Sequence, residues 1–302
     1  MKNQSRKLLG QVLALALGIV GTQSSPAQSF KKVKVALNAP IVQVASGGAS
    51  VWALSSNGHP YILKGKSFAL ANNISLSQIA VGGGNSAQAD EVWALNSSGS
   101  IFRAHKSGTS WVFSQVTGVL DGIMVGPGYQ DTCHPYEVWG LNTGSEIFRY
   151  NFCGNNFEQE PGFLCDLHVG GGDIWGAQCG PKVFRFDFGT GVFDEVSDPF
   201  GAFPVLTVGP TGVWAIDPSI FSVYQYDDFL GFIRIACCST FQVIQAGGDG
   251  VWALSGNNVY RLVHVASSFV QVPGSLVSIS VGSGGGVWGI NGSNQVFAFS
   301  TP

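Results

Sequence analysis

Four carboxylates stand two or three residues before a tryptophan: Glu91, Glu137, Asp173 and Asp249. A carboxylate at the start of a strand can accept hydrogen bonds from sugar hydroxyls, or it can cap the preceding turn through backbone N–H groups. Both interpretations stay open, and we treat Asp173 and Asp249 as candidate ligand-binding residues. A glycosidase would need two carboxylates flanking one bond, and nothing in the sequence marks such a pair.

Other kinds of catalytic chemistry find little support in the sequence. The five histidines fall at unrelated positions, and no serine or cysteine sits in a recognisable nucleophile turn. The glycine run 82–84 resembles a turn between strands, because no helix follows it to bind phosphate. No Cys-x-x-Cys pair or nearby histidine completes a tetrahedral metal site. The sequence therefore predicts neither an enzyme nor a bound cofactor or metal.

Two insertions, 85–90 and 126–136, break the regular pattern of the chain and are expected to be neighbours on one face. Insertions on one face of a repeat protein often mark the binding face. The alternative is a purely structural loop stapled by Cys133. Side chains in or near the insertions that could contact a sugar ring are Trp111, Tyr129, Asp131 and Tyr136.

A repeated phrase, an apolar residue followed by Trp and then Ala or Gly, indicates how these side chains are positioned. Its tryptophans are 41, 46, 36, 39, 38 and 36 residues apart. A period of about forty residues indicates a repeat architecture, and a residue needed in every repeat usually serves the repeat itself. The seven core tryptophans are Trp52, Trp93, Trp139, Trp175, Trp214, Trp252 and Trp288.

The last repeat shows what one unit contains. Segments 277–281, 287–290 and 295–299 have strand character, and glycine- and asparagine-rich turns separate them. Other repeats add a fourth strand, such as 268–272. Four antiparallel strands in about forty residues predict the blade of a β-propeller. We therefore expect an all-β, seven-bladed propeller whose tryptophans pack between blades, with an indole N–H near a surface pocket.

The two chain ends are expected to close the ring. The seventh repeat stops after its third strand, whereas residues 29–35 align with the outer strand 268–272. We therefore predict that residues 29–35 supply the missing fourth strand of the last blade, which removes an exposed sheet edge.

Residues 1–27 have the pattern of a secretory signal peptide, with a basic start, an apolar run and small residues before a cleavage site after Ala27. The alternative is a membrane anchor, but the apolar run is shorter than the ~20 residues that span a bilayer. The predicted mature domain is 28–302, with no membrane span. We expect a secreted, periplasmic or extracellular protein.

The composition limits the classes of partner that the protein is expected to bind. The formal net charge is −3 and only 11% of residues are charged, so there is no overall basic footprint for nucleic acid. The 42 glycines and 45% hydrophobic content suit many short strands around a large core. We expect a monomer.

Several phrases resemble the tectonin repeat, found in tachylectin-like and fish-egg lectins. They are Ile79–Gly84, Val92–Arg103 and Ile244–Arg261, and the resemblance covers essentially the whole mature chain. It implies a β-propeller and extracellular carbohydrate binding, although some family members serve intracellular trafficking. The outer-strand tryptophan of the family survives only as Trp111. Phenylalanines are expected to replace it elsewhere: Phe30, Phe68, Phe157, Phe193, Phe232 and Phe269.

The blade order restricts how the six cysteines can pair. Cys133 and Cys153 fall in loops of one blade on the same face, and Cys165 and Cys179 share the opposite face. We predict the bridges 133–153 and 165–179, which an oxidising compartment would support. For the adjacent Cys237 and Cys238, a vicinal disulfide and two free thiols both remain open.

Two main functional hypotheses follow from these observations. The first is a secreted lectin-like propeller, expected to be multivalent through repeated sites, that recognises surface polysaccharide, lipopolysaccharide or glycoprotein glycans without catalysis. The second is a protein-interaction or structural propeller without sugar binding. A polysaccharide-active enzyme is the weakest of the three alternatives.

Overall fold

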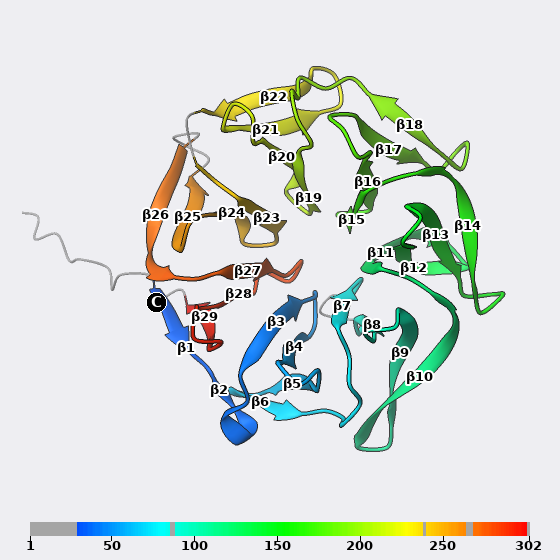
Figure 1. Ribbon diagram of the computed structural model, residues 1–302, viewed down its shortest axis with the longest axis vertical. Helices are drawn as coiled ribbons and strands as arrows, with labels where there is room; N and C mark the ends of the chain where they lie inside the picture. The colour runs from blue at the N-terminus through cyan, green and yellow to red at the C-terminus, as the bar shows by residue number, and fades with distance from the viewer. Residues whose placement is uncertain (1–28, 85–87, 238–239, 264–267, 301–302) are drawn as a thin grey trace, which may run out of the picture.

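Seven small sheets are arranged like blades around a central axis in the computed structural model, which describes residues 29–84, 88–237, 240–263 and 268–300 (Figure 1). Each blade contains four antiparallel strands, and its first strand lies nearest the axis. The predicted fold, an all-β seven-bladed propeller, is confirmed. The predicted signal peptide, 1–27, lies outside the described residues.

The strands of the seven blades are as follows. Blade 1 contains β3 (Ile41–Ser46), β4 (Val51–Ser55), β5 (Pro60–Lys64) and β6 (Ser67–Leu70). Blade 2 contains β7 (Gln78–Gly82), β8 (Glu91–Leu95), β9 (Ser100–Ser107) and β10 (Ser110–Val119). Blade 3 contains β11 (Gly122–Asp131), β12 (His134–Leu141), β13 (Glu146–Asn151) and β14 (Asn156–Phe163). Blade 4 contains β15 (Asp166–Gly170), β16 (Asp173–Ala177), β17 (Val183–Asp187) and β18 (Val192–Val196). Blade 5 contains β19 (Val205–Gly209), β20 (Gly212–Asp217), β21 (Ser222–Asp227) and β22 (Gly231–Ala236). Blade 6 contains β23 (Val243–Gly247), β24 (Gly250–Ser255), β25 (Asn258–Val263) and β26 (Ser268–Ser275). Blade 7 contains β27 (Ser278–Val281), β28 (Val287–Ile290), β29 (Val296–Ser300) and β1 (Ser29–Lys32).

The N-terminal strand closes the ring, as predicted. Strand β1 pairs with β29 from Ser29 opposite Ser300 to Lys32 opposite Phe297. The fourth strand of blade 7 is shorter than the predicted 29–35, because the N–H of Val33 donates to the carbonyl of Val296 at 2.9 Å and β29 begins at that residue. The chain instead forms β2 (Lys34–Val35), which pairs in parallel with β6 of blade 1, and then the short 3-10 turn η1 (Ala36–Asn38).

Asparagine side chains fix several hairpins between the second and third strands. In blade 2, Asn96 Oδ1 accepts hydrogen bonds from the N–H groups of Ser98 and Ser100 at 3.0 and 2.9 Å. Gly99 in this turn has a φ of 75°, which glycine adopts without steric cost. The same asparagine pattern recurs at Asn142 and Asn291. Local turn chemistry thus sets the register of these strands.

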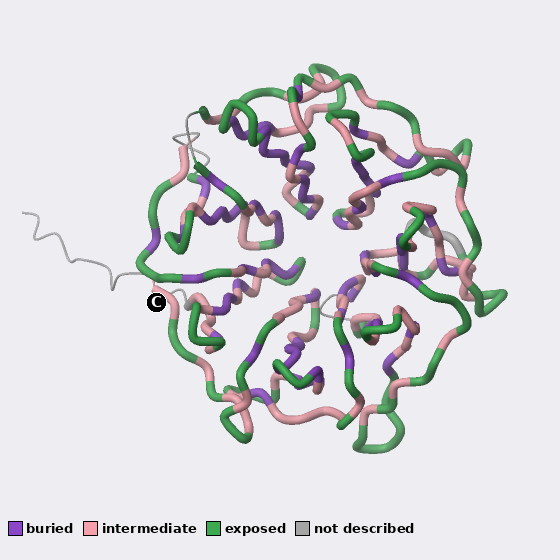
Figure 2. Tube along the Cα trace, viewed as in Figure 1, coloured by how far each residue is buried: buried purple, intermediate pink, exposed green. Residues whose placement is uncertain are grey.

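Tryptophans and outer-strand aromatics join each blade to the next. Six of the seven core tryptophans are 0 or 1% exposed, and buried residues concentrate on the inner and middle strands (Figure 2). Six of the seven rings, all but that of Trp214, pack edge-on against an aromatic residue of the following blade, and such pairs stabilise the core beyond their buried area. The pairs, with centroid distances, are Trp52–Trp111 (4.7 Å), Trp93–Phe157 (5.7 Å), Trp139–Phe193 (5.7 Å), Trp175–Phe232 (5.9 Å), Trp252–Phe30 (5.8 Å) and Trp288–Phe68 (5.7 Å). Trp214 and Phe269 share a core cluster.

The first strands surround a narrow central channel of about 360 Å³. Two glutamine side chains there form hydrogen bonds between neighbouring first strands. Gln43 donates to the carbonyl of Ile79 and accepts from its N–H, both at 3.0 Å. Gln78 makes the same paired contact with Ile123. These side chains are used within the ring, so they are not available as ligand groups.

Candidate functional site

An acid–tryptophan–arginine triad recurs in blades 2, 3, 4 and 6. The acid stands at the start of the second strand or close before the tryptophan. The arginine lies on the third strand, directly across from the tryptophan. The triads are Glu91–Trp93–Arg103, Glu137–Trp139–Arg149, Asp173–Trp175–Arg185 and Asp249–Trp252–Arg261. All four lie toward the propeller face that carries the turns between first and second strands, which we call the upper face.

The triad of blade 3 is the most deeply buried. Arg149 donates from Nη2 to Glu137 Oε1 at 2.6 Å and from Nε to Oε2 at 2.9 Å. The indole N–H of Trp139 donates to the same Oε2 at 2.7 Å. The guanidinium lies 5.3 Å from the Trp139 ring centroid, and Glu137 is 1% exposed. Every polar group of the triad therefore has a partner inside the protein, as burial of charge requires.

These contacts show how the predicted carboxylates are used. Glu91, Glu137, Asp173 and Asp249 each contact the arginine of their own blade. Within the described ranges, Asp173 is the one of these four with a backbone N–H donor, that of Ile174 at 3.1 Å. The sequence interpretation missed the arginines, although each follows its tryptophan by nine or ten residues. That spacing, combined with the preceding acid, was the signal that could have revealed the triads.

Glu91 controls the charge state of its partner in blade 2. Burial alone would lower the pKa of Arg103, but the hydrogen bond and negative charge of Glu91 outweigh it and raise the pKa above its ordinary value. Arg103 therefore stays charged, and the bidentate pair is a fixed structural element rather than an open site.

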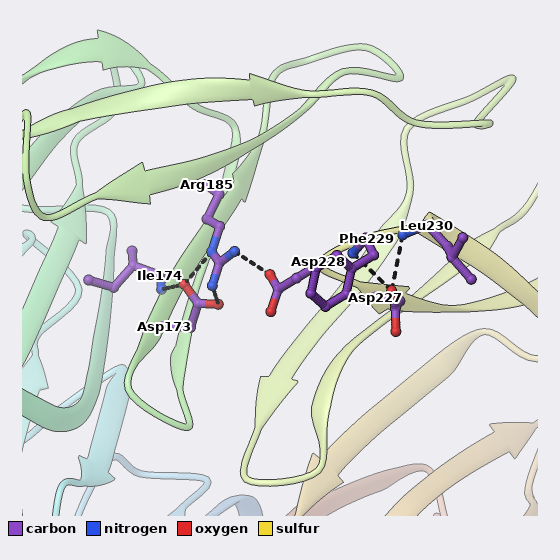
Figure 3. Close-up of polar contacts among 7 residues, drawn as sticks. All are labelled: Asp173, Ile174, Arg185, Asp227, Asp228, Phe229 and Leu230. Carbon is purple, nitrogen blue, oxygen red and sulfur yellow. Dashed lines mark hydrogen bonds and ion pairs between the residues drawn. The ribbon is translucent and has the colours of Figure 1, made fainter.

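The triad of blade 4 differs because aspartate is shorter than glutamate. Asp173 pairs with Arg185 at 3.0 Å, but the buried indole N–H of Trp175 has no hydrogen-bond partner. Arg185 also donates to Asp228 of the β21–β22 turn in blade 5, at 2.7 Å (Figure 3). In this turn, Asp227 accepts from the N–H groups of Phe229 and Leu230. Phe229 is 96% exposed.

Blades 1, 5 and 7 lack the triad. In blade 5, Gln225 lies opposite Trp214, whereas in the neighbouring blades 7 and 1 small or apolar residues take the place of the triad. Gly286 and Ala298 occupy the acid and arginine positions around Trp288. In blade 1, Ser50 and Ile62 flank Trp52 in the same way. The space that the ion pairs fill in blades 2–4 is therefore open here.

A cavity of about 720 Å³ lies over blade 1, between blades 7 and 2. Trp288 and Trp111 line it, and both are partly exposed. The Trp288 Nε1 atom lies beside Gly286, where a Cβ would approach it to 2.9 Å. Among the described residues, this N–H has no hydrogen-bond acceptor. Trp288 is thus the core tryptophan whose polar edge is available to a ligand.

Two carboxylates line the same cavity, but both are engaged. Asp90 accepts from the N–H groups of Gly48, Ala49, Ser50 and Gly84 and from the Ser50 hydroxyl, at 2.6–3.1 Å. This side chain of blade 2 therefore accepts the hydrogen bonds of the turn between β3 and β4 in blade 1. Glu91 is held by Arg103 and Trp93. Neither carboxylate is available as a catalytic base.

The two insertions meet on the upper face. The Tyr136 hydroxyl donates to the carbonyl of Ala89 at 2.9 Å. Residues 126–136, expected to form a loop, instead extend the hairpin of β11 and β12. Tyr129 and Asp131 lie at the end of β11, and their side chains are outside the described part of the structure. The candidate residues are therefore dispersed, because Trp111 lines the cavity, Asp173 lies in blade 4 and Asp249 in blade 6.

Both predicted disulfides are present. Cys133 bonds to Cys153 within blade 3, with their Cα atoms 5.0 Å apart, and Cys165 bonds to Cys179, with a Cα separation of 5.2 Å. Cys238 lies outside the described residues, so the two alternatives for Cys237 and Cys238 stay predictions. No group of three or more potential metal ligands occurs among the described residues. No helix within the described ranges is long and apolar enough to cross a membrane.

Comparisons with known proteins agree with this architecture. The chain is similar to a solved structure of YCF48 bound to D1 peptide, at 13% identity and a TM-score of 0.65, over 92% of this chain and 100% of that one. It also resembles YCF48 from Cyanidioschyzon merolae (12% identity, TM-score 0.63, 90% and 98% coverage) and the Neurospora crassa Pan2 WD40 domain (12%, 0.64, 92% and 97%). These likenesses show the fold alone. No curated protein matches the chain.

The family model gives a closer assignment than these structures. The tectonin domain model matches residues 20–197 and 200–301, which is nearly the whole chain and includes all seven tryptophan phrases. The chain therefore belongs to the tectonin domain family.

Proposed function

We propose that this protein is a secreted, non-catalytic carbohydrate-binding propeller, and that the cavity over blade 1 is a binding site. The observation that carries the proposal is Trp288. Its ring is partly exposed and its indole N–H has no acceptor among the described residues. An indole offers an apolar face to a sugar ring and a donor to its hydroxyl groups. Trp111 provides a second aromatic surface in the same cavity.

Secretion is supported by the signal-like residues 1–27 and by two disulfides, which persist in oxidising compartments. A non-catalytic role is supported by the carboxylates of the cavity. Glycoside hydrolysis needs one carboxyl group as acid and another as base or nucleophile, whereas Asp90 and Glu91 are both held by donors of the protein.

A protein-interaction role is the second candidate, and the β21–β22 turn favours it. Phe229 and Leu230 are 96 and 75% exposed, and the hydrogen bonds to Asp227 hold their backbone in place (Figure 3). Rigid exposed aromatic residues are typical interface anchors. The solved YCF48 propeller with a bound D1 peptide is a precedent for peptide recognition by this fold.

A glycan array with the mature chain tests the main proposal. We expect binding, and we expect Trp288→Phe to weaken it about tenfold, because a ligand hydrogen bond of roughly 1.4 kcal/mol is lost. Trp175→Phe is the matched control, since its N–H has no partner and lies in blade 4. Absence of binding to every glycan by the folded protein, or equal effects of the two substitutions on binding, would overturn the proposal.

A further inference from the structure

The modest net charge conceals a strong separation of charge along the chain. Residues 29–89 contain five lysines and no Asp or Glu, whereas residues 90–302 contain seven Lys or Arg and all eighteen Asp and Glu. The lysines are Lys31, Lys32, Lys34, Lys64 and Lys66, and all five are exposed. They belong to the closing strands and to blade 1, which forms the floor of the cavity described above.

Strand pairing brings two of these lysines to one wall of the groove between blades 1 and 2. Lys64 lies opposite Ser67 on one side, and Lys34 lies opposite Ser67 on the other. Directly paired residues point to the same face of a sheet, and two strand spacings separate the lysine backbones by roughly 10 Å. Alternation along β5 gives Lys64 the same face as Ile62, which packs in one core cluster with Trp52 and Trp111. This wall of blade 1 therefore faces blade 2.

Blade 2 adds a third lysine to the opposite wall. Lys106 pairs with Trp111 across β9 and β10, and its ammonium group lies 5.4 Å from the Trp111 ring centroid. Trp111 itself packs on Trp52 of blade 1, so both side chains point into the groove. Lys34 and Lys64 thus lie on the face of blade 1 toward blade 2, and Lys106 lies on the face of blade 2 toward blade 1; we call these three residues the lysine groove, and of them Lys106 lines the cavity described above.

The positive charge of the lysine groove has no compensation within the described structure. Among the described residues, Lys182 is the only lysine in an ion pair. Asp90 and Glu91 line the same cavity as Lys106. Asp90 already accepts hydrogen bonds from five donors, and Glu91 is held by Arg103 and Trp93. A groove lined by one sign of charge concentrates the electrostatic potential and attracts counter-ions. The groove is therefore best matched by an anionic ligand.

We propose that the ligand is an acidic polysaccharide, whose carboxylate or sulfate groups bind the lysine groove while a sugar ring lies against Trp111. This inference rests on the proposed carbohydrate-binding function and specifies its ligand class. An anionic membrane fits less well, because the exposed large apolar side chains among the described residues 29–112 are Leu37, Val42 and Val112, which belong to three different elements. Surface binding to lipid normally adds buried apolar area to electrostatic attraction.

Binding titrations with polygalacturonate, heparin and neutral dextran test the inference. We expect the two acidic polymers to bind and dextran not to bind, with affinity falling as salt rises, because bound lysines release counter-ions from a polyanion. The variant Lys34→Gln/Lys64→Gln/Lys106→Gln should bind about a hundredfold more weakly, or about fivefold per lysine. Lys32→Gln is the matched control, because Lys32 is also exposed on the closing strand but pairs with Phe297, which packs toward blade 6.

The outcomes separate the two proposals. If dextran binds as tightly as the acidic polymers, the protein remains a carbohydrate-binding protein, but the inferred ligand class is wrong. If the triple variant keeps full affinity and an unchanged thermal midpoint, the lysine groove is not the site. Binding to anionic lipid vesicles but not to the polymers contradicts the inference as well. A folded chain that binds no glycan contradicts both proposals.

Discussion

Blades 3 and 7 carry the same tryptophan at the same register but surround it differently. In blade 3, Trp139 is enclosed by Glu137 and Arg149, and its N–H is satisfied within the protein. In blade 7, Trp288 has Gly286 and Ala298 at the equivalent positions, its Nε1 lies beside Gly286, and both Trp288 and Gly286 line a cavity. The residues at the acid and arginine positions therefore decide whether the repeated tryptophan is enclosed in the core or partly exposed.

The seven blades of this repeat protein do not offer seven equal ligand-binding sites. Blades 2–4 fill the space beside the tryptophan with an ion pair, whereas blades 7 and 1 leave it open. A multivalent protein with one site per blade, as the sequence suggested, would require the same opening in each blade. The geometry favours one larger site over blade 1.

The largest expected effect is on stability when the blade 3 triad is broken. Glu137→Gln should destabilise the protein by about 3–5 kcal/mol, because the buried Arg149 then loses the carboxylate that it contacts directly. Ser50→Ala at the equivalent position of blade 1 should cost less, about 2 kcal/mol, because it removes one donor of the Asp90 carboxylate, which keeps its backbone N–H donors, and the acceptor of the Trp52 N–H. Urea unfolding of both variants measures the difference. Equal losses would show that the two blades use this position in the same way.

The sequence was sufficient for the fold because the repeated tryptophan and its turns are local and periodic. The closing strand and both disulfides followed from applying blade topology to the chain ends and cysteines. The cavity was not predictable in this way. It arises where Gly286, Ala298 and Ile62 replace ion-pair residues. The sequence indicates the cavity only through these replacements, which can be recognised once the triads of the other blades are known. Asp90 was also hidden, because a blade 2 residue completes a blade 1 turn.

A smaller effect is expected from the length of the acid in the triads, which is aspartate in blade 4 and glutamate in blade 3. Asp173→Glu should stabilise the protein by about 1 kcal/mol, because the longer side chain can accept the orphaned N–H of Trp175. Glu137→Asp should have the opposite effect in blade 3, where the N–H of Trp139 would lose its acceptor. Denaturant midpoints of the two single variants check the signs. A stability loss from Asp173→Glu would indicate that the contact of Arg185 with Asp228 depends on the shorter acid.

The smallest effect is expected at Glu160 of blade 3, a carboxylate whose negative charge is less well compensated than that of Glu137. Burial raises the pKa of Glu160 above its ordinary value, although Arg149 and His134 act in the opposite direction. A raised folded-state pKa means that the carboxylate form disfavours folding, so its cost appears as pH rises through the unfolded and then the folded pKa. Glu160→Gln should therefore stabilise the protein slightly at neutral pH, by less than about 0.5 kcal/mol, and have no effect well below pH 4.5. Unfolding midpoints across this range, with the exposed Glu158→Gln as control, measure the change. A loss of stability from Glu160→Gln at neutral pH that disappears toward acid pH would have the opposite sign and would mean that Arg149 compensates Glu160 as fully as it does Glu137.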